Sequence, residues 1–202
     1  MERLRTSRAG QADATPAPAL AICSAWRVAG KAIMPLSQDL LEQARALAQP
    51  ATRGGRPRQA SLRRAVSTAY YAVFHLLSAD ATAQASPVGP AGLRERVQRS
   101  LQHATMKAAA SAFQSNPVPP RIAVLLAGPV PAQLASVARG FVRLQEERHS
   151  ADYDLADQFD RNRVQGLIRE AERVFTDWNS VRNTDEARVF LAALMFWNLW
   201  SK

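Results

Sequence analysis

The amino-acid sequence predicts an all-α fold, a bundle of about five to six helices. Apolar residues recur at helical spacing in successive segments, and proline and glycine concentrate in the stretches between them. No segment has the alternation typical of a β-strand, since the best candidate, residues 122–126, is short and flanked by proline. The length of 202 residues suits one domain with a tail, which is enough to bury a substantial core.

The first two helices are predicted by their apolar stripes. Ser37 is a candidate N-cap for the first helix, and the stretch 49–57, rich in glycine and proline, predicts the loop that follows it. The stripe of the first helix consists of Leu40, Leu41, Ala44 and Leu47. The second helix, over about residues 61–79, has the clearest stripe in the chain: Leu62, Ala65, Val66, Ala69, Tyr70, Val73, Leu76 and Leu77.

Four further helices complete the predicted bundle. They cover about residues 91–113, 133–147, 160–178 and 185–200. The stretch 115–131 carries five of the twelve prolines and is expected to be mostly loop. Residues 34–202 are therefore expected to form a single helical domain.

Residues 1–33 have a different character from the rest of the chain. They contain Arg3, Arg5 and Arg8, a TPAPA tract and no sustained helical period. A leader rich in arginine and poor in acids is typical of transit peptides, but no clear cleavage pattern follows. We therefore expect residues 1–33 to be a disordered tail, or an extension upstream of a true start at Met34.

The composition excludes several classes of site. Cys23 is the only cysteine, so an intramolecular disulfide framework and a cysteine-based zinc cluster are excluded. The three histidines lack HExxH spacing, and the glycine-rich phosphate-binding spacings are absent, so we expect neither a metal nor a cofactor. No apolar run reaches the roughly 18–20 residues of a membrane span. A reducing cytoplasm is the simplest compartment, with no membrane partner.

The net charge of +9 favours a polyanionic partner such as RNA, DNA or an acidic protein surface. Without residues 1–33 the chain still has 21 basic against 15 acidic residues, so the body itself is basic. The alternative explanation is genome composition, because arginine outnumbers lysine 23 to 3. Charge alone leaves both explanations open.

A polar strip runs beside the apolar stripe of the second helix. Arg64, Tyr71 and His75 are spaced i, i+7 and i+11, so they share one side of the helix. They would line a cleft that binds nucleic acid, or a dimer face. A boundary strip of amphipathic side chains is the simpler alternative. His103, a lone histidine on the next helix, is interpreted as structural.

The densest group of charged residues follows the point where the buried stripe of the fourth predicted helix fades. It comprises Arg143, Glu146, Glu147, Arg148, His149, Asp152, Tyr153, Asp154, Asp157 and Asp160. The pattern is typical of a helix that emerges at an exposed edge. Histidine is the side chain suited to exchanging protons near neutral pH, which makes His149 the candidate acid or base. The guanidinium groups of Arg143 and Arg148 beside it can hold a phosphate.

RNA cleavage by attack of the 2′-hydroxyl needs no metal. It needs a base, an acid and positive charge for the phosphorane, which His149 and Arg143 can supply. On a straight helix these two residues lie about 120° apart, so a shared dimer site or a bend would suit one phosphate better. Local salt bridges at i, i+4, Arg143 to Glu147 and Arg148 to Asp152, are the alternative explanation.

Three phrases, LRRAVSTAYYAVFHLL, LQHATMK and FVRLQEERHSADYDL, occur in this order and resemble HEPN-domain proteins of prokaryotes over about residues 36–180. The resemblance implies an up-and-down helical bundle that is usually a homodimer. Many HEPN proteins are metal-independent ribonucleases, with an Arg followed after four to six residues by a His at the dimer cleft. Arg143 and His149, with five residues between them, satisfy that spacing and are the implied catalytic pair.

The resemblance also implies partners. Many HEPN proteins are toxins encoded beside a minimal nucleotidyltransferase antitoxin, and some are silenced by adenylylation of a Tyr two residues after the His. That position is Ala151 here, so Tyr153 is the candidate for modification or support, with Asp152 beside it. Active members often have a polar residue after the Arg, where this chain has Leu144. The alternative functions are a non-catalytic module that binds nucleotide, nucleic acid or protein, and a structural partner of a nucleotidyltransferase.

Overall fold

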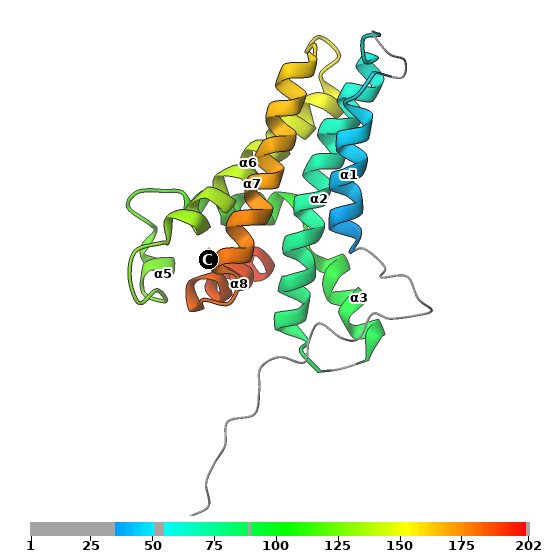
Figure 1. Cartoon of the computed structure of the whole chain (residues 1–202). Helices are drawn as coiled ribbons and strands as arrows, with labels where there is room; N and C mark the ends of the chain where they lie inside the picture. The colour runs from blue at the N-terminus through cyan, green and yellow to red at the C-terminus, as the bar shows by residue number, and fades with distance from the viewer. Residues whose placement is uncertain (1–34, 51–54, 89, 201–202) are drawn as a thin grey trace, which may run out of the picture. The chain divides into compact units, whose positions relative to one another are not determined.

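The computed structural model describes residues 35–50, 55–88 and 90–200, whose arrangement is shown in Figure 1. Over these ranges the chain forms helices and no strand, which confirms the all-α prediction. The helices are α1 (Leu36–Leu47), α2 (Gln59–Ala85), α3 (Ala91–Ser100), α4 (His103–Phe113), α5 (Pro120–Ala123), α6 (Ala132–Tyr153), α7 (Arg161–Val181) and α8 (Asp185–Trp200). They all belong to one compact unit, Pro35–Lys202. The predicted tail, residues 1–33, lies outside the described residues.

The eight helices exceed the predicted five to six, for two reasons. The stretch 91–113 forms α3 and α4, because Leu101 and Gln102 have extended backbone between them. Leu101 is buried, so the break turns a core side chain inward and lets α4 pack against α6 and α8. The short α5 lies in the proline-rich stretch, where Pro119 precedes the helix and Pro120 begins it, a position that needs no N–H donor.

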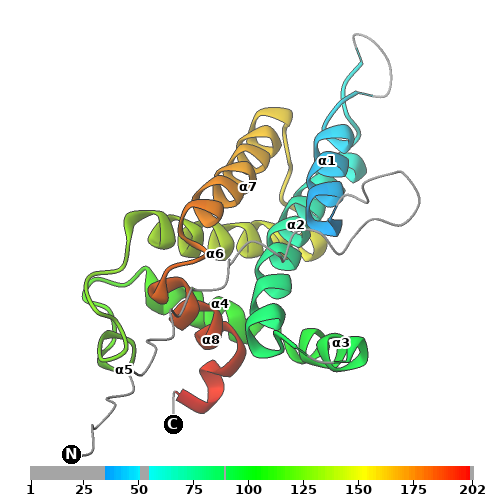
Figure 2. The same ribbon diagram turned by 60° about the horizontal axis from the view of Figure 1, so that its bottom comes forward.

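The helix α2 is the centre of the fold. Seven of its eight predicted stripe residues are buried and Leu76 is partly buried. Several of its polar side chains, including Ser67 and Thr68, are buried as well. A helix buried on most faces has to be covered on most faces. Accordingly α1, α6, α7 and α8 all contact α2, and both views show α1 alongside it (Figures 1 and 2).

The helix α6 carries the charged segment and continues past the predicted end near residue 147 to Tyr153. The predicted apolar face is buried throughout: Leu134, Val137, Ala138, Phe141 and Val142. Leu144 and Ala151, which are seven residues or about two turns apart, continue this buried face. The residues of the charged segment up to Tyr153 are therefore helical, and helical periodicity decides which of them face solvent.

The start of α1 differs from the prediction, whereas the start of α7 and one close contact help to position α6 and α7. Ser37 is not the N-cap of α1, because the helix begins at Leu36 after Pro35, and Ser37 is buried. The N-cap of α7 is Asp160, whose carboxylate accepts a hydrogen bond from a backbone N–H in the first turn at 2.9 Å. At Gly140 the absence of a side chain lets α6 approach α7, since a Cβ there would overlap Cγ2 of Val174.

Candidate functional site

The acidic residues of the charged segment bind neighbouring groups and so stabilise the fold. All six acidic side chains between residues 146 and 160 accept hydrogen bonds or form ion pairs with neighbouring groups: Glu146, Glu147, Asp152, Asp154, Asp157 and Asp160. Two of these contacts cap the backbone, at residues 156 and 163. Because each carboxylate has a structural partner, the segment offers few free groups for chemistry, and they are mainly basic or aromatic.

Arg163, in the first turn of α7, joins two of these acids. Its guanidinium donates to Oε2 of Glu147 at 2.7 Å and to Oδ1 of Asp157 at 2.7 Å. The Ser150 hydroxyl also donates to Asp157. The hydrogen bonds from Arg163 and Ser150 lower the pKa of Asp157 to about 2, so its carboxylate remains ionised near neutral pH. This cluster ties the end of α6 to the start of α7.

Arg63 of α2 holds the same connection from another side. Its guanidinium donates to the carbonyl oxygens of Ala151 at 2.9 Å and Asp154 at 2.8 Å, and also to that of Asp157. The last carbonyls of a helix have no partner within it, so a donor from elsewhere must satisfy them. Arg63 thus fixes how α6 ends, and with it the place of Tyr153.

Arg148 bridges α6 and α2 rather than standing free. Its Nε lies 2.7 Å from Oδ2 of Asp152, which confirms the predicted i, i+4 pair, and its Nη2 donates to the Tyr71 hydroxyl at 3.1 Å. The Ser67 hydroxyl donates to the other oxygen of Asp152 at 2.5 Å. The guanidinium also lies over the rings of Tyr71 and Tyr153, 5.6 and 5.7 Å from their centroids. With a side chain only 19% exposed, Arg148 is mainly a structural link.

His75 and His103 lie beside this link in an aromatic cluster. The Tyr70 hydroxyl is 2.6 Å from Nδ1 of His103, and the His103 ring packs 4.3 Å from that of Phe74. Burial raises the pKa of Tyr70 and lowers that of His103, to which the nearby Arg148 charge also contributes. Both shifts keep the pair neutral, so the hydroxyl donates to Nδ1. This supports the interpretation of His103 as structural.

The predicted polar strip of α2 is only partly assembled. Tyr71 and His75 are neighbours, with ring centroids 6.5 Å apart. Burial lowers the pKa of His75, and its Nδ1 is buried without a hydrogen-bond partner among the described residues. Arg64 is exposed, and no hydrogen bond or cation–π contact joins its side chain to either ring within the described ranges. The strip therefore divides into a half-buried aromatic part and a separate exposed arginine.

Arg143 and His149 lie on different sides of α6. The Arg143 side chain is 63% exposed, and its Nη1 pairs with Oε2 of Glu170 on α7 at 3.1 Å. The predicted pair with Glu147 does not form, because Glu147 binds Arg163 instead. The His149 side chain is exposed and packs its ring 5.0 Å from that of Tyr153. Within one chain, Arg143 and His149 have separate partners and no contact joins them.

Residues 144 and 151, where the resemblance to HEPN proteins leads one to expect a polar residue and a tyrosine, are both buried. Leu144 is fully buried and Ala151 is 4% exposed, and both lie on the core face of α6. A polar side chain at 144 or a tyrosine at 151 would have to enter the core. Tyr153, two residues further on, is 65% exposed. The exposed tyrosine nearest to His149 is thus placed there by the register of α6.

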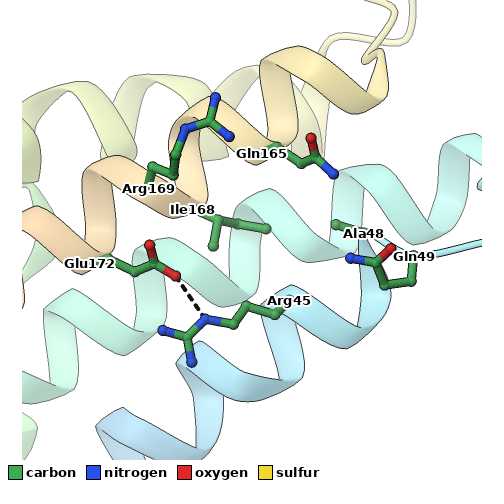
Figure 3. Close-up of a pocket in the computed structure, with 7 residues that line it drawn as sticks. All are labelled: Arg45, Ala48, Gln49, Gln165, Ile168, Arg169 and Glu172. Atoms are coloured by element: carbon green, nitrogen blue, oxygen red, sulfur yellow. Dashed lines mark hydrogen bonds and ion pairs between the residues drawn. The ribbon is translucent and has the colours of Figure 1, made fainter.

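A small open pocket lies between α1 and α7, away from these residues (Figure 3). It is lined by Arg45, Ala48, Gln49, Gln165, Ile168, Arg169 and Glu172. An ion pair of 2.7 Å between Arg45 and Glu172 crosses it. None of the candidate site residues lines this pocket.

Several residues that position the site had no distinctive signal in the sequence. Arg63 and Arg163 lie among many other arginines, and Ser67 and Glu170 stand singly at unremarkable positions. Arg63 and Ser67 bind groups as far as 94 and 85 residues away in the chain, and Arg163 is 16 residues from Glu147. Glu170 is 27 residues from Arg143. Only the tertiary packing of α2, α6 and α7 brings them together. An i, i+4 rule could not have found these contacts.

The comparisons with known proteins identified no relative: no family model, curated protein or solved structure matches the chain. The likeness to HEPN proteins therefore rests on the sequence phrases alone. Among the described residues, no group of three or more His, Cys, Asp or Glu side chains is arranged to hold a metal ion. In the same part of the chain, no helix has the length and apolar character needed to cross a membrane.

Proposed function

We propose that the protein is a HEPN-type, metal-independent endoribonuclease, toxin-like in character, that acts as a homodimer. His149 is the general acid or base, and Arg143 stabilises the charge of the phosphorane. The observation that carries this proposal is the exposure of His149 on α6. The other two histidines are half-buried in the aromatic cluster, and the acids around His149 have structural partners.

The proposed reaction uses only groups of the protein. An imidazole removes the proton of a ribose 2′-hydroxyl, whose oxygen attacks the adjacent phosphorus, and the 5′-oxygen leaves with a proton from an acid. A guanidinium holds the negative charge that builds up on the phosphate oxygens. The exposed Arg143 and His149 are of the types that this chemistry needs.

A dimer is part of the proposal because of the helix geometry. Arg143 and His149 are about 120° apart around α6 and have separate neighbours, Glu170 and Tyr153. A second copy with its own α6 opposite the first would supply an Arg143 to each His149. It would also supply two imidazoles, one for each proton transfer.

The test is cleavage of a single-stranded RNA by the full chain in the presence of EDTA. We expect His149→Ala and Arg143→Ala each to lower the cleavage rate by about 10² or more, as for the loss of a positioned acid, base or charge. Arg96→Ala, at an exposed site on α3, is the matched control and should cleave like the wild type. Cleavage by both site variants at the wild-type rate would end the proposal.

The second candidate is a non-catalytic module that binds RNA, a nucleotide or a nucleotidyltransferase partner. It is favoured by the Arg143–Glu170 ion pair, which holds the guanidinium on the α7 side of α6. In this case RNA binding would be measurable while no cleavage product appeared at any enzyme concentration. Arg64, Tyr71, His75 and Arg148 remain candidate RNA contacts in either case, and Asp152 and Tyr153 remain candidates for support or modification.

A further inference from the structure

The region where α6 passes close to α7 carries a cluster of arginines, and the catalytic proposal uses only Arg143 among them. Gly140 brings the two helices together, because any Cβ at this position would overlap Val174. Arg139 and Arg143 flank Gly140 on α6, and Arg173 precedes Val174 on α7. Side chains as long as arginine can then reach over the same surface from both helices.

The charge of this region is strongly unbalanced. Glu170 is the acid paired with Arg143, at 3.1 Å, and Arg173 is near enough to act on the same carboxyl. Burial raises the pKa of Glu170, and these two arginines oppose that effect. Arg139 is exposed and forms no ion pair with any described residue. Glu147, the other acid nearby, is bound by Arg163. Arg143 and Arg173 thus share the carboxylate of Glu170, and Arg139, one turn from Arg143, has no ion-pair partner among the described residues.

We propose that Arg139, Arg143 and Arg173 form a patch that binds the phosphates of single-stranded RNA where α6 passes α7. This inference rests on the proposed function, since it names the surface that would lead the RNA to Arg143. Arg139 and Arg143 are one turn apart, about 6 Å along the helix, so they can contact different phosphates. Glu170 orients Arg143 toward this surface.

RNA fits this patch better than an acidic protein does. Protein interfaces have an apolar centre, whereas a nucleic-acid backbone is bound mainly by basic side chains. Among the described residues, the exposed large hydrophobic side chains are Leu36, Val88, Leu93, Val124, Leu125, Tyr153, Leu155, Phe196 and Leu199. None of them lies on α7, and on α6 only Tyr153 does, at the far end from Arg139. The patch has cations without an apolar centre.

The test measures binding separately from cleavage. A fluorescently labelled single-stranded RNA is titrated with the full chain carrying His149→Ala, and anisotropy is read at several salt concentrations. Added to this background, Arg139→Gln with Arg173→Gln should weaken binding about tenfold or more. The slope of log affinity against log salt should become shallower by about 1.4, or about 0.7 for each lost phosphate contact with a single strand.

Matched controls separate the patch from general charge. Arg96→Gln with Arg99→Gln on α3 removes the same charge from exposed positions and should change neither affinity nor slope by more than a small amount. Arg139→Lys with Arg173→Lys keeps the charge and should keep most of the affinity. Circular dichroism and thermal unfolding establish that each variant is folded.

The outcomes distinguish the two proposals. RNA binding that depends on Arg139 and Arg173, without cleavage by the wild type, would support the patch and remove the nuclease. Equal losses in the patch and control variants would overturn the patch, whatever the cleavage assay gives. Equal affinity for DNA of the same sequence, or tighter binding to polyglutamate, would overturn the assignment to RNA.

Discussion

Arg148 and His149 are adjacent in the chain but differ in their surroundings on α6. Arg148 points toward α2, where Asp152 and Tyr71 bind its guanidinium and leave its side chain 19% exposed. The His149 side chain is exposed, and its ring packs against that of Tyr153. Successive residues of a helix are rotated by about 100°, so Arg148 lies against α2 while the imidazole of the next residue is exposed.

The comparison teaches how to interpret a dense run of charges on a helix. The inner side of α6 uses its charges to hold neighbouring elements, through Arg148 and through Glu147 with Arg163. The outer side has Arg139, Arg143 and His149, of which one has a close ion-pair partner. Local salt bridging was one of the alternatives in the sequence, and the structure shows it on the inner side. The outer side is where the proposed binding surface would lie.

The largest difference between the two sides should appear in stability. Phe141 on the inner side is fully buried, with its ring centroid 5.7 Å from that of Tyr70. Phe141→Ala should lower the free energy of unfolding by about 3–5 kcal/mol, because it leaves a cavity in the core. His149→Ala should change it by less than about 0.5 kcal/mol. Urea unfolding measures both. Similar losses in the two variants would contradict the division of α6 into an inner and an outer side.

A smaller effect is expected at the contact between α6 and α7. Gly140→Ala would normally favour a helix, but here the new methyl meets Val174. We expect a net loss of about 1–3 kcal/mol from overpacking, measured as a drop in the unfolding midpoint. Adding Val174→Ala makes room for the methyl, so the double variant should lose less than the two single losses added together. Strict additivity would mean that these residues do not meet.

The smallest effect is a pH dependence of stability that comes from the aromatic cluster around His75 and His103, on α2 and α4. Burial lowers the folded-state pKa of His75 and His103 below the ordinary 6.5, so the unfolded chain binds more protons in acid. The free energy of unfolding should therefore keep its full value above pH 6.5. It should fall as the pH decreases toward the folded-state pKa values of the two histidines. The slope cannot exceed about 1.4 kcal/mol per pH unit for each histidine.

Unfolding by urea at pH 7.5, 6.5 and 5.5 measures this slope. Replacing both residues, with His75→Gln and His103→Gln, should flatten it even if the variant is less stable throughout. If the double variant kept the full slope, the pH dependence would have to come from other groups.

Much of the fold follows from the sequence because it depends on local periodicity. The stripe of α2 and the apolar face of α6 are buried as predicted, since both repeat regularly over several turns. The division between α3 and α4 could not be predicted, because the break falls at Leu101 and Gln102 and no glycine or proline marks it. Burial of Leu101 decides that break, and burial depends on the other helices.

The candidate site was less predictable for the same reason. The Arg148–Asp152 pair is local and could be predicted, whereas the partner of Arg143 is Glu170 on another helix. The sequence favoured Glu147 as that partner, and only the place of Arg163 in the fold explains why Glu147 is already bound. The spacing of residues in the sequence does not show which of several distant arginines will bind a given carboxylate.

Arg63 bears on the meaning of the arginine-rich composition. A guanidinium has several N–H groups in a fixed plane, and in Arg63 they reach carbonyl oxygens of three residues on and after α6. A lysine ammonium at this position would keep the charge but could not span the same acceptors. Genome composition can raise the number of arginines, but it cannot make every one of them exchangeable for lysine. Arg63 is therefore a position at which the contacts of the fold call for arginine, whatever raised the number of arginines in the chain.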